Sequence, residues 1–177
     1  QKSRNLRKNN NILTIMAVGG CSKLGNGLEA VLNKNFLTQP NLSDAFNKIV
    51  IVTDRDEAGT EQSFIQRVQQ VLNSHNVNYS TLSNNCWADC SMLNQMGVII
   101  NFSILLLIIP FEENGAIETF LLNAIGNKDA YDKTMINACN QFVDQIDPNE
   151  KYLTSRRYIT KVKFDTYFSI RTPVEQY

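Results

Sequence analysis

Residues 48–59 contain a short apolar run that ends in two aspartates, and this segment constrains the fold more than any other. The run Ile49–Thr53 is rich in β-branched residues, which predicts a strand buried on both faces. Asp54 and Asp56 follow it directly, and a helical pattern begins at Thr60. Open α/β sheets bind ligands at the carboxyl ends of their strands, where paired carboxylates offer the oxygen ligands that Mg²⁺ prefers. The segment therefore predicts an α/β fold with a metal site at the rim of its sheet.

The composition is that of a protein with a packed core. Hydrophobic residues make up 43% of the 177 positions, and 17 basic residues balance 17 acidic ones. Such a balance provides no overall positive field, which counts against a DNA coat protein but not against an enzyme with local positive charge. The longest apolar stretch, Val98–Phe111, is shorter than the ~20 residues of a membrane span. We expect no membrane segment and a cytoplasmic location.

Further apolar runs alternate with helical patterns along the chain. Buried strands are expected at Ile12–Val18 and Ile104–Ile109, and helices after Gly27 and over residues 60–73, 115–124 and 132–145, with Asp129 or Asp132 as the cap of the last. Residues 156–168 are expected to form a final helix or strand, and residues 1–10 the end of a helix. This alternation predicts one α/β domain whose mainly parallel sheet is flanked by helices. Its core covers about residues 12–125, and a helical, basic extension covers about residues 126–177.

A second strand also runs into acidic residues. Glu112 and Glu113 follow the strand that ends at residue 109, and Glu118 lies in the first turn of the next predicted helix. In a parallel sheet these side chains reach the same rim as Asp54 and Asp56, which strengthens the prediction of a metal site. The alternative is that both segments are solvated acidic turns, since carboxylates also favour the positive end of a helix.

Two other segments offer groups for binding phosphate. Gly19 and Gly20 close the first predicted strand, where glycines let backbone N–H groups approach an anion, and Lys23 follows them. The Lys-Ser/Thr pair of a nucleotide-binding P-loop is absent, which argues against ATP or GTP hydrolysis. Near the other end, Arg157 and Lys161 belong to a basic cluster that could offset the charge of a phosphate, although a solvated face is the commoner explanation.

Cysteine and histidine suggest no second kind of site. Cys86 and Cys90 have no further cysteine pair to complete a zinc site, and His75 is the one histidine of the sequence. A Ser/His or Cys/His catalytic system is not expected for the same reason.

The three junctions together resemble the toprim domain of topoisomerases, primases and OLD-type (overcoming lysogenization defect) nucleases. The similarity runs from about Ile12 to Leu122 and includes Val18-Gly19-Gly20 and Thr53-Asp54-Arg-Asp56-Glu-Ala-Gly59. Gly115-Ala-Ile-Glu118 is similar to a segment of OLD-type toprim domains in which a glutamate helps the aspartates to hold metal. The resemblance implies a Rossmann-like fold, a Mg²⁺ or Mn²⁺ site made by Asp54, Asp56 and Glu118 with Glu112 or Glu113 assisting, and a supporting lysine at Lys161. Small stand-alone bacterial toprim-like proteins also end in a similar basic, aromatic segment.

One part of the family pattern is missing. The first toprim strand ends in a glutamate, but no glutamate precedes Glu29, and Ile12–Gly20 fits the second strand. We expect the first strand to lie upstream of Gln1; the alternative is a degenerate toprim domain.

The resulting functional prediction is a metal-dependent phosphodiester hydrolase acting on nucleic acid, with a possible ATPase or other protein partner. A non-catalytic nucleic-acid or protein-binding module is the alternative. A phosphotransfer receiver fits less well, because the strand ending at residue 109 does not end in a phosphoacceptor aspartate.

Overall fold

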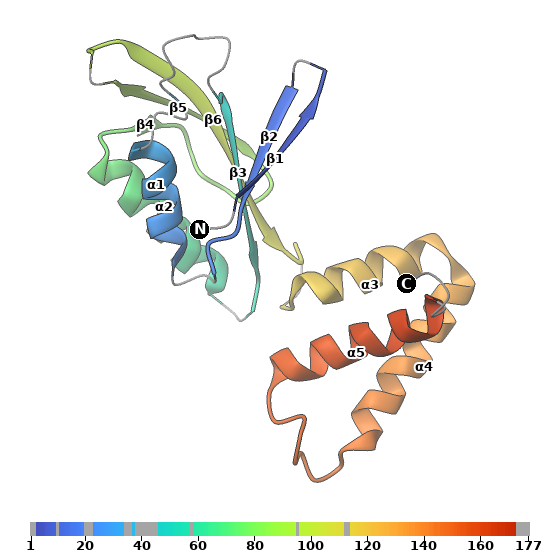
Figure 1. Cartoon of the computed structure of the whole chain (residues 1–177). Helices are drawn as coiled ribbons and strands as arrows, with labels where there is room; N and C mark the ends of the chain where they lie inside the picture. The colour runs from blue at the N-terminus through green and yellow to red at the C-terminus, as the bar shows by residue number, and fades with distance from the viewer. Residues whose placement is uncertain are drawn as a thin grey trace. The chain divides into compact units, whose positions relative to one another are not determined.

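The structure is a computed structural model that describes residues 3–9, 11–19, 23–33, 37, 46–56, 59–94, 96–111 and 114–172. Strands and helices follow one another in the order β1 (Ser3–Lys8), β2 (Asn11–Met16), α1 (Leu24–Asn33), β3 (Lys48–Asp54), α2 (Thr60–Ser74), β4 (Asn78–Tyr79), β5 (Trp87–Leu93), β6 (Ile99–Ile109), α3 (Ile117–Lys128), α4 (Ala130–Ile146) and α5 (Arg156–Arg171). The fold is therefore of the mixed α/β class (Figure 1).

The chain divides into two compact units. The sheet unit comprises Gln1–Val52 and Glu61–Leu107, and the helical unit comprises Thr53–Thr60 and Ile108–Tyr177. β3 and β6 begin in the sheet unit, and their last residues belong to the helical unit. The carboxyl ends of these two strands are therefore part of the same compact unit as α3, α4 and α5.

The sheet unit contains a four-stranded sheet in the order β3-β6-β5-β4, and β1 and β2 form a separate antiparallel hairpin. The Ser103 N–H donates to the Asn47 carbonyl, and the Arg55 N–H donates to the Ile109 carbonyl. The residue numbers increase in both strands from the first hydrogen bond to the second, so β3 is parallel to β6. β5 is antiparallel to β6, with Cys90 opposite Phe102, and β4 is antiparallel to β5.

The expected mainly parallel sheet is thus a mixed sheet in the described residues. Strand β5 was not predicted, because its sequence joins apolar residues to Asp89, Cys90 and Ser91 without a regular alternation. The connection from β5 to β6 covers residues 94–98. A parallel crossover needs a dozen or more residues, so this short connection requires an antiparallel pair.

Helices α1 and α2 lie side by side on one face of the sheet (Figure 1). Their buried residues are Leu24, Gly27, Leu28 and Leu32 of α1 and Phe64, Val68, Val71 and Leu72 of α2. The sheet contributes alternate residues of β6, such as Phe102, Ile104 and Leu106, each at most 3% exposed. A side chain at Gly25 of α1 would lie 3.7 Å from Val71 of α2, so the two helices are in direct contact.

The helical unit has its own core between α3, α4 and α5. Leu122, Ile136, Cys139 and Tyr167 are buried there, and Phe164 and Phe168 pack against them. Asp129 caps α4 by accepting a hydrogen bond from the Asp132 N–H at 2.9 Å, as one of the two predicted caps.

Several local predictions were wrong. The strands expected to be buried are partly exposed, with Leu13 at 56% in β2 and Val52 at 51% in β3, because β2 belongs to a separate hairpin and β3 is an edge strand of its sheet. Residues 3–8 form strand β1 rather than the end of a helix, and α1 begins at Leu24, ahead of Gly27. Residues 156–168, for which a helix or a strand was expected, belong to the helix α5, which covers Arg156–Arg171. Among the described residues, no helix is both long and apolar enough to cross a membrane.

Candidate acidic site

Asp54 ends β3 and caps a helix that is distant in sequence. Its Oδ1 atom accepts a hydrogen bond from the backbone N–H of Ile117, the first residue of α3, at 2.9 Å. The preceding residue, Ala116, provides no side-chain cap, so Asp54 satisfies an N–H group that the helix leaves unpaired. The two acidic junctions predicted from the sequence therefore meet in the structure.

The electrostatics of Asp54 show which other charges are near. Burial raises the pKa of Asp54, and the negative charges of Asp56 and Glu118 raise it further. The hydrogen bond from Ile117 and the positive charge of Arg157 act in the opposite direction. Three carboxylates and one guanidinium of the predicted site are thus close enough to interact, and together they concentrate negative charge.

Backbone pairing brings the two junctions together. Arg55 forms an antiparallel bridge with Gly115, whose N–H donates to the Arg55 carbonyl at 2.9 Å. A Cβ atom at Gly115 would lie 3.1 Å from Thr119 Oγ1 and 3.2 Å from Pro110 Cγ. This space is tight for any side chain, which explains why a glycine stands between the strand and α3.

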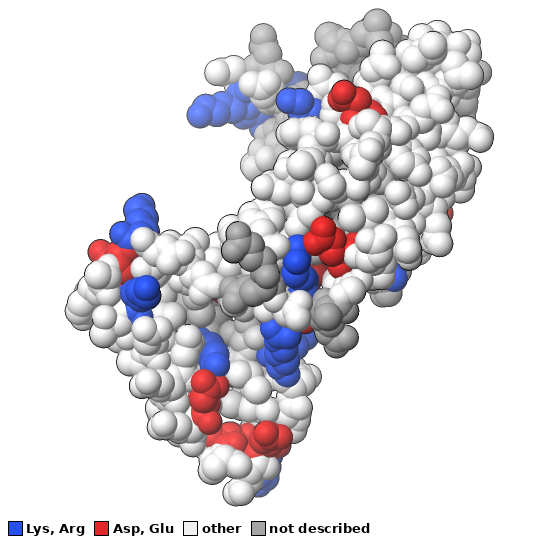
Figure 2. All heavy atoms as spheres, turned by 180° about the vertical axis from the view of Figure 1, so that it is seen from behind, with Lys and Arg blue, Asp and Glu red and all other residues white. Residues whose placement is uncertain are grey.

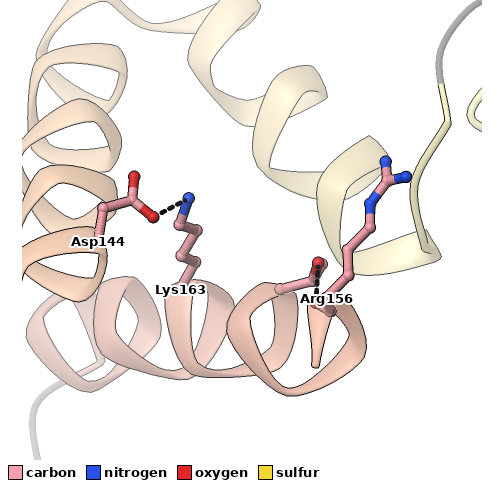
Figure 3. A network of polar contacts seen from close by, with 4 residues as sticks. Asp144, Arg156 and Lys163 are labelled. Atoms are coloured by element: carbon pink, nitrogen blue, oxygen red, sulfur yellow. Dashed lines mark hydrogen bonds and ion pairs between the residues drawn. The ribbon is translucent and has the colours of Figure 1, made fainter. Parts of the chain in front are cut away.

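Arg156, at the first position of α5, binds both junctions. Its Nη1 atom donates to the Asp56 carbonyl at 3.2 Å, and its Nη2 atom donates to the Asn114 carbonyl. Figure 3 shows its guanidinium extended away from α5 toward the chain that leads into α3. No sequence pattern assigns a role to Arg156, because its two partners lie 100 and 42 residues away.

The other basic residues of α5 differ in whether they form an ion pair. Lys163 forms an ion pair with Asp144 of α4 at 2.7 Å, which Figure 3 also shows. Arg157 and Lys161 are exposed and make no hydrogen bond or ion pair with another described residue. On the face seen in Figure 2, basic and acidic side chains are interspersed over the helical unit rather than gathered into one large field.

The remaining predicted residues are not assembled at this site. Gly19 has a positive φ of 80°, and a Cβ atom there would lie 3.8 Å from Lys23 Cδ, so these two residues are neighbours in the sheet unit. Their prediction as phosphate ligands stays a prediction. Gly20, Glu112 and Glu113 lie outside the described residues.

The described carboxylates are of the right chemical type to bind a divalent cation, but too few of them lie close together. Asp54, Asp56 and Glu118 provide hard oxygen donors, and a cation would relieve the repulsion that raises the pKa of Asp54. Asp54 Oδ2 makes no hydrogen bond to a described residue. However, no group of three or more His, Cys, Asp or Glu side chains in the described part of the chain is arranged closely enough to hold an ion.

A cavity of about 660 Å³ lies elsewhere, in the sheet unit. Residues of β2, α1 and β3 line it, most of them apolar, and none of the predicted site residues is among them. The described residues of its lining include no carboxylate.

Comparison with known proteins gives one match. The model of a family described as "Protein of unknown function (DUF3226)" matches residues 2–176. No curated protein and no solved structure matches the chain.

Proposed function

The chain belongs to the DUF3226 family, and we propose that it is a metal-dependent phosphodiester hydrolase acting on nucleic acid in the cytoplasm. One observation carries the proposal: Asp54 accepts a hydrogen bond from the first N–H of α3, and the charges of Asp56 and Glu118 act on it. The toprim resemblance supports the same function, since it assigns metal binding to Asp54, Asp56 and Glu118.

The proposed chemistry divides between the carboxylates and the basic face of α5. Asp54, Asp56 and Glu118 would hold Mg²⁺ or Mn²⁺, which supplies charge neutralisation and lowers the pKa of water. Arg157, whose charge already acts on Asp54, would bind the phosphate. Lys161 lies one helical turn from Arg157 and would offset the charge that develops on the phosphate during cleavage.

Cleavage of labelled single-stranded DNA, duplex DNA and RNA in Mn²⁺ and Mg²⁺ tests the proposal. We expect metal-dependent cleavage that Asp54→Asn, Asp56→Asn and Glu118→Gln each lower by at least about 100-fold, as the loss of a charged group at a reacting centre does. Asp165→Asn is the matched control, because Asp165 is an exposed acid of α5 without a place in the site. Absence of cleavage, or cleavage that the three site variants leave unchanged, would contradict the proposal.

A second function is favoured by a specific observation. One oxygen of Asp54 is already engaged by α3, and the described residues contain no complete ligand group. A non-catalytic module that binds nucleic acid or protein on a degenerate toprim scaffold would not need a complete set of metal ligands. Titration of the protein with Mn²⁺ separates the two functions, since the hydrolase requires binding that Asp56→Asn weakens, whereas the module does not.

A further inference from the structure

The basic residues at the start of α5 fall into two classes. Arg156 and Lys163 are committed to internal contacts, the former with backbone carbonyls and the latter with Asp144. Arg157 and Lys161 have no such partner among the described residues and are exposed. With 3.6 residues per turn, these two lie about 40° apart around the helix, and Tyr158 lies within about 100° of Arg157. The exposed first two turns of α5 therefore carry two cations and an aromatic ring, whereas Phe164 and Phe168 further along the same side pack against the core.

The start of α5 adjoins the acidic site, because Arg156, the residue before Arg157, donates to the Asp56 carbonyl at 3.2 Å. The charge of Arg157 acts on Asp54, so the two side chains are within electrostatic range. Tyr158 follows Arg157 directly and is 55% exposed.

A second exposed ring precedes α5. Tyr152 is 72% exposed, and the Nζ atom of Lys151 lies 5.0 Å from the centre of its ring. Its backbone is held in place, because the Asp147 carboxylate accepts hydrogen bonds from the N–H groups of Lys151 at 3.1 Å, Tyr152 at 2.7 Å and Leu153 at 2.8 Å. An exposed ring on a fixed backbone is a suitable surface for stacking, because little conformational freedom is lost when a ligand binds.

The two exposed tyrosines lie close together along the chain. The three residue steps from Tyr152 to the helix cap Ser155 span at most about 10 Å. One helical turn to Tyr158 adds about 5 Å. The Cα atoms therefore lie within about 15 Å of each other, so one short strand can reach both residues.

We propose that this basic-aromatic surface, comprising Lys151, Tyr152, Arg157, Tyr158 and Lys161, binds single-stranded nucleic acid next to the acidic site. Bases stack on the two tyrosine rings, and phosphates contact the cations. Exposed ring faces can stack only on bases that are free of a duplex, and stacking with a cationic groove is the general mode of single-strand binding. The inference rests on the proposed function, for which it specifies the strandedness of the substrate.

Fluorescence anisotropy of a labelled oligothymidylate, measured on the full chain in EDTA so that no cleavage occurs, tests the surface. We expect Tyr158→Ala to weaken binding about tenfold, Tyr152→Ala to weaken it less, and Tyr158→Phe to bind like the wild type, because stacking needs the ring and not the hydroxyl. Arg157→Gln and Lys161→Gln should each reduce the slope of log K against log salt by about 0.7, the value for one phosphate contact on a single strand.

Matched controls come from α4. Tyr131 is 74% exposed and Lys133 is also exposed, and neither adjoins the acidic site. Tyr131→Ala and Lys133→Gln should leave binding unchanged, and circular dichroism of every variant confirms folding. Equal losses in Tyr131→Ala and Tyr158→Ala, equal affinity for a duplex of the same length, or a Tyr158→Phe variant as weak as Tyr158→Ala would overturn the proposal.

The outcome is separable from the proposed function. Asp54→Asn and Asp56→Asn should abolish cleavage while retaining single-strand binding. Binding that depends on Tyr158 without any cleavage would reject the hydrolase and keep the surface. Cleavage of single strands that Tyr158→Ala leaves unchanged would keep the hydrolase and reject the surface.

Discussion

The carboxylate of Asp54 and the backbone N–H of Ile117 form a hydrogen bond of 2.9 Å that joins the end of β3 to the beginning of α3. The same side chain is the first candidate ligand of the proposed metal site. A structural role and a chemical role therefore fall on one residue, and they make different demands on its substitution.

Asp54→Ala should lower the free energy of unfolding by about 1 kcal/mol, because it removes a helix cap. Asp54→Asn should cost less, since its amide oxygen still accepts the Ile117 N–H and the repulsion from Asp56 and Glu118 disappears. Urea unfolding measures both. Asp56→Ala is the control and should be close to neutral, because the Asp56 side chain is exposed and caps no helix among the described residues. Equal losses in the alanine and asparagine variants of Asp54 would contradict the capping role.

Arg156→Ala should lower the free energy of unfolding by roughly 1–2 kcal/mol, since two carbonyl groups lose a charged donor. If Arg156 also positions the acidic residues, the affinity for Mn²⁺ should fall with it, although no ligand is removed. Lys163→Ala is the control, because it breaks the ion pair with Asp144 and leaves the site intact. Calorimetric titration with Mn²⁺ separates the roles: a purely structural Arg156 would change the unfolding midpoint and leave metal affinity unaltered.

Asp147 should make the turn before α5 sensitive to acid. The N–H groups of Leu153, Tyr152 and Lys151 hold the pKa of Asp147 below its ordinary value of 3.8. A carboxyl whose folded pKa is lowered contributes stability above its unfolded pKa and loses it as the pH falls through the folded one. The difference in Tm between the wild type and Asp147→Asn should therefore be largest near neutral pH and disappear in acid. A difference independent of pH would show that charge is not involved.

The described cysteines should differ in reactivity. Burial raises the pKa of Cys90 to about 11, and burial also raises the pKa of Cys139, whereas Cys86 is exposed. The thiolate is the reactive form, so Cys86 should be labelled first by a maleimide at pH 8. Cys86→Ser should remove one fast-reacting thiol in a mass-spectrometric time course, and Cys90→Ser should remove none. Fast labelling of Cys90 in the folded protein would contradict its burial.

Residues with a strong local pattern were predicted well. The position of β3, the apolar face of α2 around Phe64 and Val68, and the cap at Asp129 all depend on neighbours within a few positions. The burial of β3 on both faces was not predicted correctly, since Val50 and Val52 are exposed. β5 was missed because Trp87–Leu93 is held by its partner β6 rather than by its own composition. Without the antiparallel strand β5, the expected strands indicated a mainly parallel sheet, and this prediction was wrong.

The site was predicted in part for a similar reason. Junctions that each carry carboxylates are visible in the sequence, and the structure brings Asp54, Asp56 and Glu118 within electrostatic range. The hydrogen bond to Ile117 and the contacts of Arg156 involve backbone groups, which every residue possesses. No sequence pattern marks them. Residues 156–168 were left open as a helix or a strand, and the helix α5 directs Lys163 to Asp144.

Arg156 has a consequence for the order in which the molecule forms. The Asp54–Ile117 bond closes a separation of 63 residues, and the contacts of Arg156 close separations of 42 and 100 residues. Contacts this distant form late, because chain entropy opposes them until nearer contacts exist. During synthesis the acidic residues leave the ribosome well before Arg156 does. A growing chain thus carries the carboxylates without the contacts that hold them together, and the site is completed only when α5 has been made.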